Sequence, residues 1–318
     1  MLRQCCWLRV ASDAAAAGGG AKQKQDSFFS LLRRLMAWNS SNAAAADAAA
    51  ASSSSSVAPT TVNSDIKNNS NNNNNGTTPT AFEAVEASVL TRWTCRHFDK
   101  AQPIDMKKLE RVLAATTRAP TGFNLQGWYA IVVTEMPVRE RLFQAALGQP
   151  QVLDAPATVV FVGDTEPECN APQALEMGLE TGYYGPLYGA AYLRNIYYFM
   201  HGGPMQTVAA AKSVLSTWYS QVTGTPVISA PVSRAGYAWK QTMIPATTFM
   251  QLATAAGWDT CMMEGIDEEA VKRVLGVPAR CTVPVLISVG HATAAAAERA
   301  KVRSSRFATA HLIRWNKF

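Results

Sequence analysis

Three low-complexity tracts limit which part of this chain can fold around a core. Residues 43–51 are almost entirely alanine, residues 52–56 are serine, and residues 68–75 are almost entirely asparagine. Such tracts have no apolar face whose burial could offset the entropy of ordering them, about 1–2 kcal/mol per residue for the backbone. We therefore predict a disordered linker over residues 40–80 and a folded domain over residues 82–318.

The segment before the linker has the composition of an organellar targeting sequence. Residues 27–39, SFFSLLRRLMAWN, place apolar side chains on one helical face, and residues 1–39 contain six Lys or Arg against two Asp. An amphipathic, basic and acid-poor N-terminus is typical of a transit peptide, and a floppy basic tail is the alternative. We expect residues 1–39 to be a mitochondrial transit segment.

Charge and hydropathy argue against nucleic-acid binding and against a membrane span. The formal net charge is +6, and residues 1–80 hold seven Lys or Arg against four Asp or Glu. The predicted domain therefore carries only about +3, which gives little support to nucleic-acid binding. The longest apolar stretch, residues 183–200, contains Pro186, two glycines and Arg194. We predict no transmembrane segment and interpret this stretch as an aromatic segment that covers other parts of the domain.

Cysteine and histidine spacings match none of the common metal sites. The six cysteines include no CxxC pair, and the four histidines include no HExxH pair. The phosphate-binding motifs GxxxxGK[ST] and GxGxxG and the nucleophile motif GxSxG are missing too. The sequence therefore predicts no metal site, and we expect most cysteines of the domain to be small buried hydrophobes.

Hydrophobic patterns within the predicted domain indicate an α+β fold. Residues 129–134, 157–163 and 283–290 are β-branched runs bounded by Pro or Gly, as in buried strands. Asp105 precedes a helical pattern as an N-cap residue, and apolar residues of 247–258 recur at helical spacing. The predicted order is helices, strand, helix, strand, a long helical region, strand, helix and strand.

Short polar clusters occur between these elements, and each has an ordinary structural interpretation. Arg92 and Arg96 could be helix-end arginines in solvated salt bridges, and the clusters that follow could be capping loops. Gly265 would allow a backbone conformation or a close approach that a Cβ would block. The clusters are TRWTCRHFDK (91–100), APTGFNLQGW (119–128), LGQPQVLDAP (147–156), MMEGID (262–267) and KVRSSR (301–306).

Taken together and in this order, the clusters resemble the FMN-dependent nitroreductase family. The match consists of the Arg-x-Thr-x-Arg-x-Phe start, the AP-x-x-x-N-x-Q-x-W loop, GQPQV-x-x-AP, GWDTCMMEGID and a basic pair before the C-terminal arm, and it covers residues 82–318. With its leader and asparagine-rich linker, the chain is most similar to mitochondrial nitroreductases of kinetoplastid protists. The resemblance implies a central mixed sheet flanked by helices and a homodimer with FMN at the subunit interface.

The resemblance also implies a role for individual residues. Arg92 and Arg96 would donate to the phosphate and the pyrimidine edge of FMN, where a guanidinium can form charge-assisted pairs. Gln151 stands where some relatives carry a lysine near flavin N1 and O2, so it would stabilise the reduced anionic flavin less. The full implied set is Arg92, Trp93, Thr94, Arg96, Thr121, Gly122, Asn124, Gln126, Gln151, Met263, Glu264, Gly265, Arg303 and Arg306.

Three segments of this set have distinct implied tasks. Loop residues 121–126 would reach the flavin across the dimer interface, and the turn 263–265 would present a backbone N–H to flavin N5. Arg306 best matches the phosphate-binding arginine of the family. Arg303 is the second candidate and Lys301 the third, and both also fit a solvated basic run.

The implied mechanism is ping-pong transfer of hydride from NADH or NADPH through flavin N5 to a nitroaromatic, nitroheterocyclic or quinone acceptor. It requires no dedicated acid or base, and we assign no catalytic side chain. Residues 183–200, with Trp218, Tyr219 and Tyr237, would form a lid, or would be ordinary packing. The alternatives are another flavin-dependent reduction, such as that of quinones or enones, a flavin-free interaction protein, and a basic nucleic-acid-binding protein.

Overall fold

The computed structural model describes residues 80–202, 207–227, 231 and 233–318. Of these, Ala171–Tyr197 belong to one compact unit, and Thr80–Asn170 with Tyr198–Phe318 belong to a second unit. The predicted transit segment and all of the predicted linker except Thr80 lie outside the described residues. Thr80 is the N-cap of the first helix, where its side chain accepts a hydrogen bond from the backbone of Glu83.

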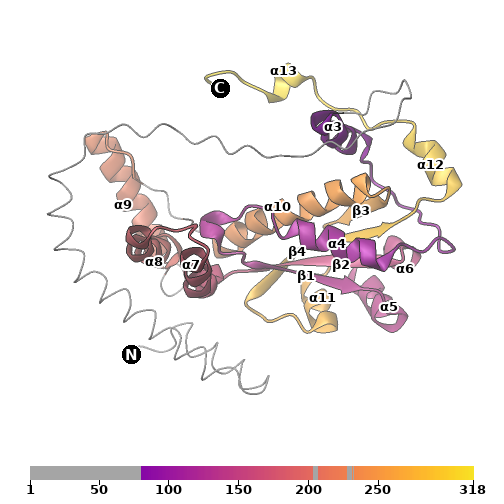
Figure 1. Cartoon of the computed structure of the whole chain (residues 1–318), viewed down its shortest axis with the longest axis horizontal. Helices are drawn as coiled ribbons and strands as arrows, with labels where there is room; N and C mark the ends of the chain where they lie inside the picture. The colour runs from indigo at the N-terminus through magenta and orange to yellow at the C-terminus, as the bar shows by residue number, and fades with distance from the viewer. Residues whose placement is uncertain (1–79, 203–206, 228–230, 232) are drawn as a thin grey trace. The chain divides into compact units, whose positions relative to one another are not determined.

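A four-stranded sheet forms the centre of the second unit, with strand order β1-β2-β4-β3 (Figure 1). All three strand ladders are antiparallel, and within the described residues the one parallel pairing is an isolated bridge between Thr94 and Thr260. The predicted strands are confirmed. The bounds are Trp128–Val133 for β1, Ala157–Asp164 for β2, Asp259–Met263 for β3 and Cys281–Gly290 for β4.

Helices and strands follow one another along the chain in the order that the sequence predicts. The side chain of Asp105 accepts hydrogen bonds from the N–H groups of Lys107 (2.9 Å) and Lys108 (3.2 Å), which confirms the predicted N-cap of α4. The bounds are Ala81–Thr91 (α3), Met106–Thr116 (α4), Gly122–Asn124 (η1), Met136–Ala145 (α5), Gln151–Asp154 (α6), Pro167–Asn170 (η2), Ala171–Glu180 (α7), Pro186–Met200 (α8), Thr207–Thr223 (α9), Arg234–Ala255 (α10), Glu268–Leu275 (α11), Ala294–Ala300 (α12) and Thr309–Leu312 (α13).

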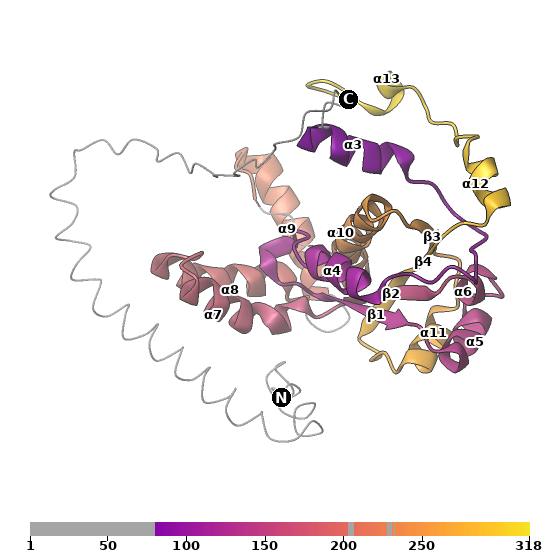
Figure 2. The ribbon, with the colours of Figure 1, turned by 45° about the vertical axis from the view of Figure 1, so that its right-hand side comes forward.

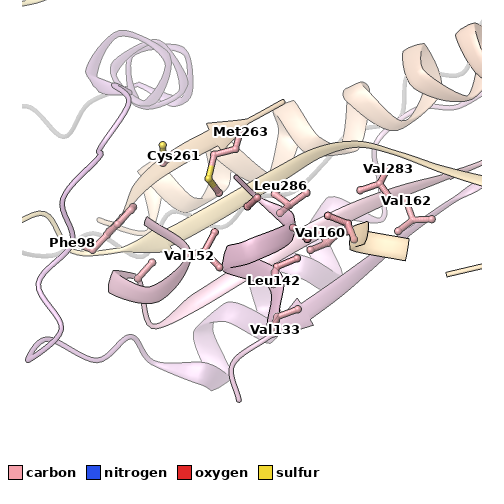
Figure 3. Close-up of a cluster of buried hydrophobic side chains, with 14 of the residues drawn as sticks. Phe98, Val133, Leu142, Val152, Val160, Val162, Cys261, Met263, Val283 and Leu286 are labelled. Atoms are coloured by element: carbon pink, nitrogen blue, oxygen red, sulfur yellow. The ribbon is translucent and has the colours of Figure 1, made fainter. Parts of the chain in front are cut away.

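The two central strands, β2 and β4, are buried on both faces, which explains why they are continuous apolar runs rather than alternating ones. Figures 1 and 2 show α10 on one face and α5 with α11 on the other. Val160 and Val162 of β2 contribute to the cluster beneath α5, which Figure 3 shows. Val159 and Phe161 of the same strand contribute to the cluster beneath α10. The α+β fold with a sheet flanked by helices is therefore confirmed.

The unit formed by Ala171–Tyr197 is built around tyrosines. The ring of Tyr184 lies 5.1 Å from the rings of both Tyr188 and Tyr192, and a Cβ at Gly178 would lie only 2.0 Å from Tyr184. Residues 186–200 form α8. Among the residues described, no helix is both long and apolar enough to cross a membrane.

Candidate functional site

The segment after α3 is held against the outer edge of β3. The N–H of Cys95 donates to the carbonyl of Thr260 (3.0 Å), next to the bridge between Thr94 and Thr260. Cys95 and Phe98 are buried in the cluster beneath α5, toward which Figure 3 shows Phe98, Cys261 and Met263 pointing. These buried residues alternate with exposed ones, so the fold anchors the segment and leaves Arg96 at the surface.

A cavity of about 220 Å³ lies where this segment meets the end of α10 and the start of β3. Thr260 is one of its lining residues, and the buried side-chain oxygen of Thr260 has no hydrogen-bond partner among the described residues. Neither Arg92 nor Arg96 forms an ion pair with any described residue, so the salt-bridge interpretation of these arginines is wrong for this part of the chain. The lining residues are Thr91, Arg92, Trp93, Thr254, Gly257, Trp258, Asp259 and Thr260.

Asp259 fixes the indole of Trp93 at the wall of this cavity. Trp93 Nε1 donates to Asp259 Oδ1 (2.7 Å), and the N–H of Ala292 donates to Asp259 Oδ2 (2.9 Å). Both carboxylate oxygens are thus satisfied by neutral donors. The positive charge of Arg92 therefore stays available for an anion.

Gln151, at the start of α6, adds a second unsatisfied polar atom. Gln151 is 6% exposed, its Nε2 atom lies 3.5 Å from the thiol of Cys261, and its Oε1 atom has no hydrogen-bond partner in the described part of the chain. Burial raises the pKa of Cys261, while the hydrogen bond from Gln151 and the positive charge of Arg96 lower it. The amide of Gln151 thus contacts this thiol, and the positive charge of Arg96 acts on it electrostatically.

The turn after β3 presents a free backbone donor. The carbonyl of Gly265 accepts a hydrogen bond from Gln149 Nε2 (2.9 Å), and the N–H of Ile266 donates to the carbonyl of Glu264 (3.0 Å). The N–H of Gly265 donates to no group among the residues described. Met263 is buried at the end of β3, whereas Glu264 and Gly265 are exposed.

The structure narrows the reasons for a glycine at position 265. Gly265 is not among the glycines with positive φ, so the conformational explanation is wrong. A Cβ there would meet no atom of the described chain within 4 Å. The fold itself therefore does not require glycine, and the explanation that remains is close approach by something outside the chain.

Loop residues 121–126 adopt a strained backbone. Phe123, Asn124 and Gln126 have φ values of 55°, 54° and 49°. Left-handed conformations in non-glycine residues cost about 1 kcal/mol or more each and cluster at functional sites. Gly122 donates its N–H to Gln241 Oε1 (2.6 Å), and a Cβ on Gly122 would lie 2.3 Å from the hydroxyl oxygen of Tyr237.

The same contacts place the loop far from the cavity. Tyr237 is buried and packs against Gly122, so it belongs to the support of the loop rather than to a mobile lid. Gln241 and Thr254 lie 13 residues apart on α10, which corresponds to roughly 20 Å along a helix. The structure therefore separates the predicted site residues of one chain into two groups, one at residues 121–126 and the other around β3.

The C-terminal cations differ in where they lie. Arg303 Nη1 donates to the carbonyl of Thr91 (3.0 Å), which borders the cavity. Arg306 Nη1 donates to Ser304 Oγ (2.8 Å) within its own segment, and Lys301 pairs with Glu298 (2.6 Å). The structure thus brings Arg303 to the cavity and does not bring Arg306 there.

Sequence reasoning missed three residues of this region. Thr260 and Asp259 lie in the recognised GWDTCMMEGID motif, but only the fold reveals an orphaned hydroxyl and a carboxylate that orients Trp93. Gln149 lies in the recognised GQPQV motif, and its role depends on a contact with Gly265, 116 residues away. Among the residues described, no group of His, Cys, Asp or Glu could hold a metal ion.

Comparisons with known proteins agree with one another. Residues 89–291 match a family model described as "Nitroreductase family". A Bacillus subtilis (strain 168) protein named as an NAD(P)H nitroreductase, MhqN, is 28% identical over 199 residues, which cover 63% of this chain and 84% of that protein.

Solved structures share the fold. A Bacillus subtilis crystal structure described as the nitroreductase YdfN has a TM-score of 0.57 and 25% identity, and the match covers 72% of this chain and 97% of that one. A nitroreductase structure from Exiguobacterium sibiricum 255-15, solved in complex with FMN, has a TM-score of 0.56 and 18% identity, and the match covers 73% and 96%.

Proposed function

This chain belongs to the nitroreductase family, and from that premise we propose that it is an NAD(P)H-dependent, FMN-containing oxidoreductase that reduces nitroaromatic or nitroheterocyclic compounds and quinones. The name of the Bacillus relative supports an NAD(P)H-dependent oxidoreductase, and the FMN complex of a structural neighbour supports the cofactor. The proposal includes the narrower similarity of this chain to the mitochondrial nitroreductases of kinetoplastids.

The main support for the proposal is that three polar groups in or beside β3 have no hydrogen-bond partner among the described residues. These groups are the buried hydroxyl of Thr260, the buried Oε1 atom of Gln151 and the exposed N–H of Gly265. A buried polar atom without a partner costs about 1–3 kcal/mol, so a ligand that satisfies it gains that energy. FMN carries a phosphate, hydroxyls and a ring edge with both donors and acceptors, so the residues present fit this cofactor.

Each residue around β3 has a task that its chemistry suits. Arg92 and Thr260 would hold the phosphate in the cavity, with Arg303 close to them. Arg96 and Gln151 would bind the pyrimidine edge, where the positive charge of Arg96 stabilises negative charge on the ring. When bound, FMN supplies the chemistry that passes two electrons from a nicotinamide to an organic acceptor. The N–H of Gly265 would fix the ring at its reacting edge.

A homodimer would complete the site. Loop residues 121–126 lie roughly 20 Å along α10 from the cavity of their own chain, beyond the reach of one binding site. Their strained backbone is nevertheless held in place by α10. We infer that this loop contacts the cofactor bound by a second copy of the chain, as the family resemblance implies.

The visible absorption spectrum of the purified full chain tests the proposal. We expect a flavin spectrum that bleaches on anaerobic addition of NADH or NADPH and returns when a nitroheterocycle is added. A panel of quinones and enones then identifies the preferred acceptor. A colourless protein that FMN does not reconstitute would refute the proposed function.

We also propose that the protein is mitochondrial, on the basis of the basic, acid-poor composition of residues 1–39. A fusion of residues 1–80 to a fluorescent reporter should accumulate in mitochondria. A matched fusion with Arg33 and Arg34 changed to glutamate should stay in the cytosol. Cytosolic retention of the unmodified fusion would refute the proposed location.

A further inference from the structure

The turn after β3 contains two successive peptide groups whose polar atoms are almost all engaged. The carbonyl of Glu264 accepts from the N–H of Ile266 (3.0 Å), and the carbonyl of Gly265 accepts from Gln149 Nε2 (2.9 Å). Because a trans peptide is planar, the direction of each carbonyl fixes the direction of the N–H in the same peptide. The remaining group, the N–H of Gly265, is thereby oriented without a partner in the described chain.

Gln149 connects this turn to a rigid part of the fold. Its Nε2 atom also donates to the carbonyl of Ala146 (3.1 Å), at the end of α5. A second hydrogen bond also connects the turn to α5: the N–H of Asp267 donates to the carbonyl of Ala145 (2.9 Å). Ala145 and Ala146 are buried in the cluster beneath α5, so the turn is anchored to the core.

The two glutamines of the GQPQV motif have different surroundings. Gln151 is buried, contacts Cys261 and keeps an unsatisfied Oε1 atom. Gln149 is half-buried, and its Nε2 atom donates to the backbone carbonyls of Ala146 and Gly265. Gln151 therefore has an atom available for a ligand, whereas the donor atom of Gln149 is already used by the protein.

We propose that Gln149 is a positioning residue that acts through two linked peptides. It holds the carbonyl of Gly265, and the N–H of Ile266 in that same peptide donates to the carbonyl of Glu264. The carbonyl of Glu264 shares its peptide with the N–H of Gly265, so Gln149 helps to hold that N–H in place. The inference rests on the proposed function, because FMN is the ligand that would receive this N–H. The proposed role adds Gln149 to the residues of the site, as a residue that acts on the cofactor only through the backbone of the turn. Losing Gln149 should therefore affect reduction of the bound cofactor more than its affinity.

Three variants of Gln149 separate this role from a general structural one. Gln149→Met keeps the length of the side chain but removes the donor, and Gln149→Glu replaces the donor with a negative acceptor facing two carbonyls. Gln149→Lys restores a donor of sufficient reach and serves as the rescue. Gln144→Met is the matched control, because Gln144 is exposed on α5 and its amide makes no hydrogen bond among the residues described.

The first readout needs no cofactor. Amide hydrogen exchange of the apo chain at Ile266 and Asp267 should become at least about threefold faster in Gln149→Met and Gln149→Glu, with an unchanged melting temperature, because a single exposed hydrogen bond contributes little to global stability. Gln149→Lys and Gln144→Met should exchange like the wild type. Unchanged exchange in Gln149→Met would overturn the proposal, whether or not the chain binds flavin.

The second readout uses FMN-loaded protein. Stopped-flow reduction by NADH should be about tenfold slower in Gln149→Met, the loss expected when a preorganised donor is misaligned, while the Kd for FMN changes less than about threefold. A parallel loss of FMN affinity and reduction rate would contradict positioning. If the wild type binds no FMN, the proposed function fails, and the exchange experiment still decides whether Gln149 holds the turn.

Discussion

At the scale of single residues, the region around β3 contains polar atoms that a folded protein normally pairs. Thr260 is 2% exposed and Gln151 is 6% exposed, yet each has a side-chain oxygen without a hydrogen-bond partner among the residues that the structure describes. Thr260 and Arg92 line the same cavity, and neither Arg92 nor Arg96 forms an ion pair with any residue in the described ranges. The combination of unsatisfied buried oxygens and unpaired cations points to an anionic, hydrogen-bonding ligand.

We predict that Arg92→Met weakens FMN binding by about 10- to 100-fold, because a hydrogen bond to a charged group contributes about 1.5–3 kcal/mol. Titration with FMN, followed by quenching of flavin fluorescence, measures the Kd. Arg118→Met is the matched control, because Arg118 is exposed beyond the end of α4 and away from the cavity. Equal affinities of the two variants would refute a phosphate-binding role for Arg92.

A second residue-scale prediction concerns pH. Burial raises the pKa of the Cys95 thiol from 9.0 to about 12. The unfolded chain loses this proton near pH 9 while the folded chain keeps it, so the stability linked to Cys95 is complete below pH 9 and decreases as the pH rises toward 12. The difference in unfolding free energy between wild type and Cys95→Ala should therefore shrink as the pH rises from about 8 to 11.

Urea unfolding at a series of pH values measures this difference. Val152→Ala is the control, because Val152 is fully buried in the same cluster and does not titrate. Its destabilisation relative to wild type should stay constant over the same range. A constant difference for Cys95→Ala as well would mean that the thiol is not held neutral by burial.

At the scale of elements, α5 ends in a motif that usually requires glycine. The N–H of Gly148 donates to the carbonyl of Phe143 (2.9 Å), and Leu147 occupies the left-handed position with φ of 56°. Leu147 is 67% exposed, so its side chain contributes little burial that could compensate the strain. The turn reverses the chain direction after α5 and brings Gln149 within hydrogen-bond distance of Ala146 and Gly265.

We therefore predict that Leu147→Gly raises the free energy of unfolding by about 0.5–1 kcal/mol, because glycine adopts positive φ without a Cβ clash. Glu140→Gly, at an exposed position within the same helix, should lower it by about 1 kcal/mol. Urea denaturation of both variants measures these changes. Destabilisation by Leu147→Gly would show that the leucine side chain contributes more than its exposure suggests.

The elements themselves were largely predictable, whereas several local conformations were not. Buried strands and capped helices follow from β-branched runs and from Asp105, because their patterns are local in sequence. The positive φ values of Phe123, Gln126 and Leu147 contradict local preference and depend on tertiary contacts such as Gly122 with Gln241. At position 265 the predicted backbone conformation is wrong, because φ is not positive there, and the predicted close approach stays a prediction.

At the scale of the whole molecule, the fold holds two groups of predicted site residues apart within one chain. The resemblance implied that the loop at residues 121–126 reaches the flavin of Arg92 and Arg96 across a dimer interface, and the sheet register gives the distance between the two groups. Trp128, at the end of the loop, pairs with Gly163, whereas Thr260 pairs with Val289, which pairs with Ala157 at the opposite end of β2. Six residues of β2 correspond to roughly 20 Å along a strand.

This separation leads to a prediction about mixed dimers. At an FMN concentration close to the wild-type Kd, Arg92→Met should leave the site of its own chain largely without FMN and therefore inactive. Replacement of residues 121–126 by a glycine–serine loop should inactivate the site of the second copy. In a dimer with one chain of each kind, one site receives both defects and the other receives none. Two inactive homodimers, after denaturation and joint refolding, should therefore regain activity.

The activity expected of the refolded mixture follows from random pairing of the two kinds of chain. Random pairing makes about half of all dimers mixed, and each mixed dimer has one intact site of two, so about a quarter of wild-type activity should return. Joint refolding of Arg92→Met with Arg96→Met is the control, because both defects lie on the same side of the site and every mixed dimer stays impaired. If the first mixture stays inactive although sedimentation shows dimers, each chain binds its cofactor alone, and the loop at 121–126 is strained for another reason.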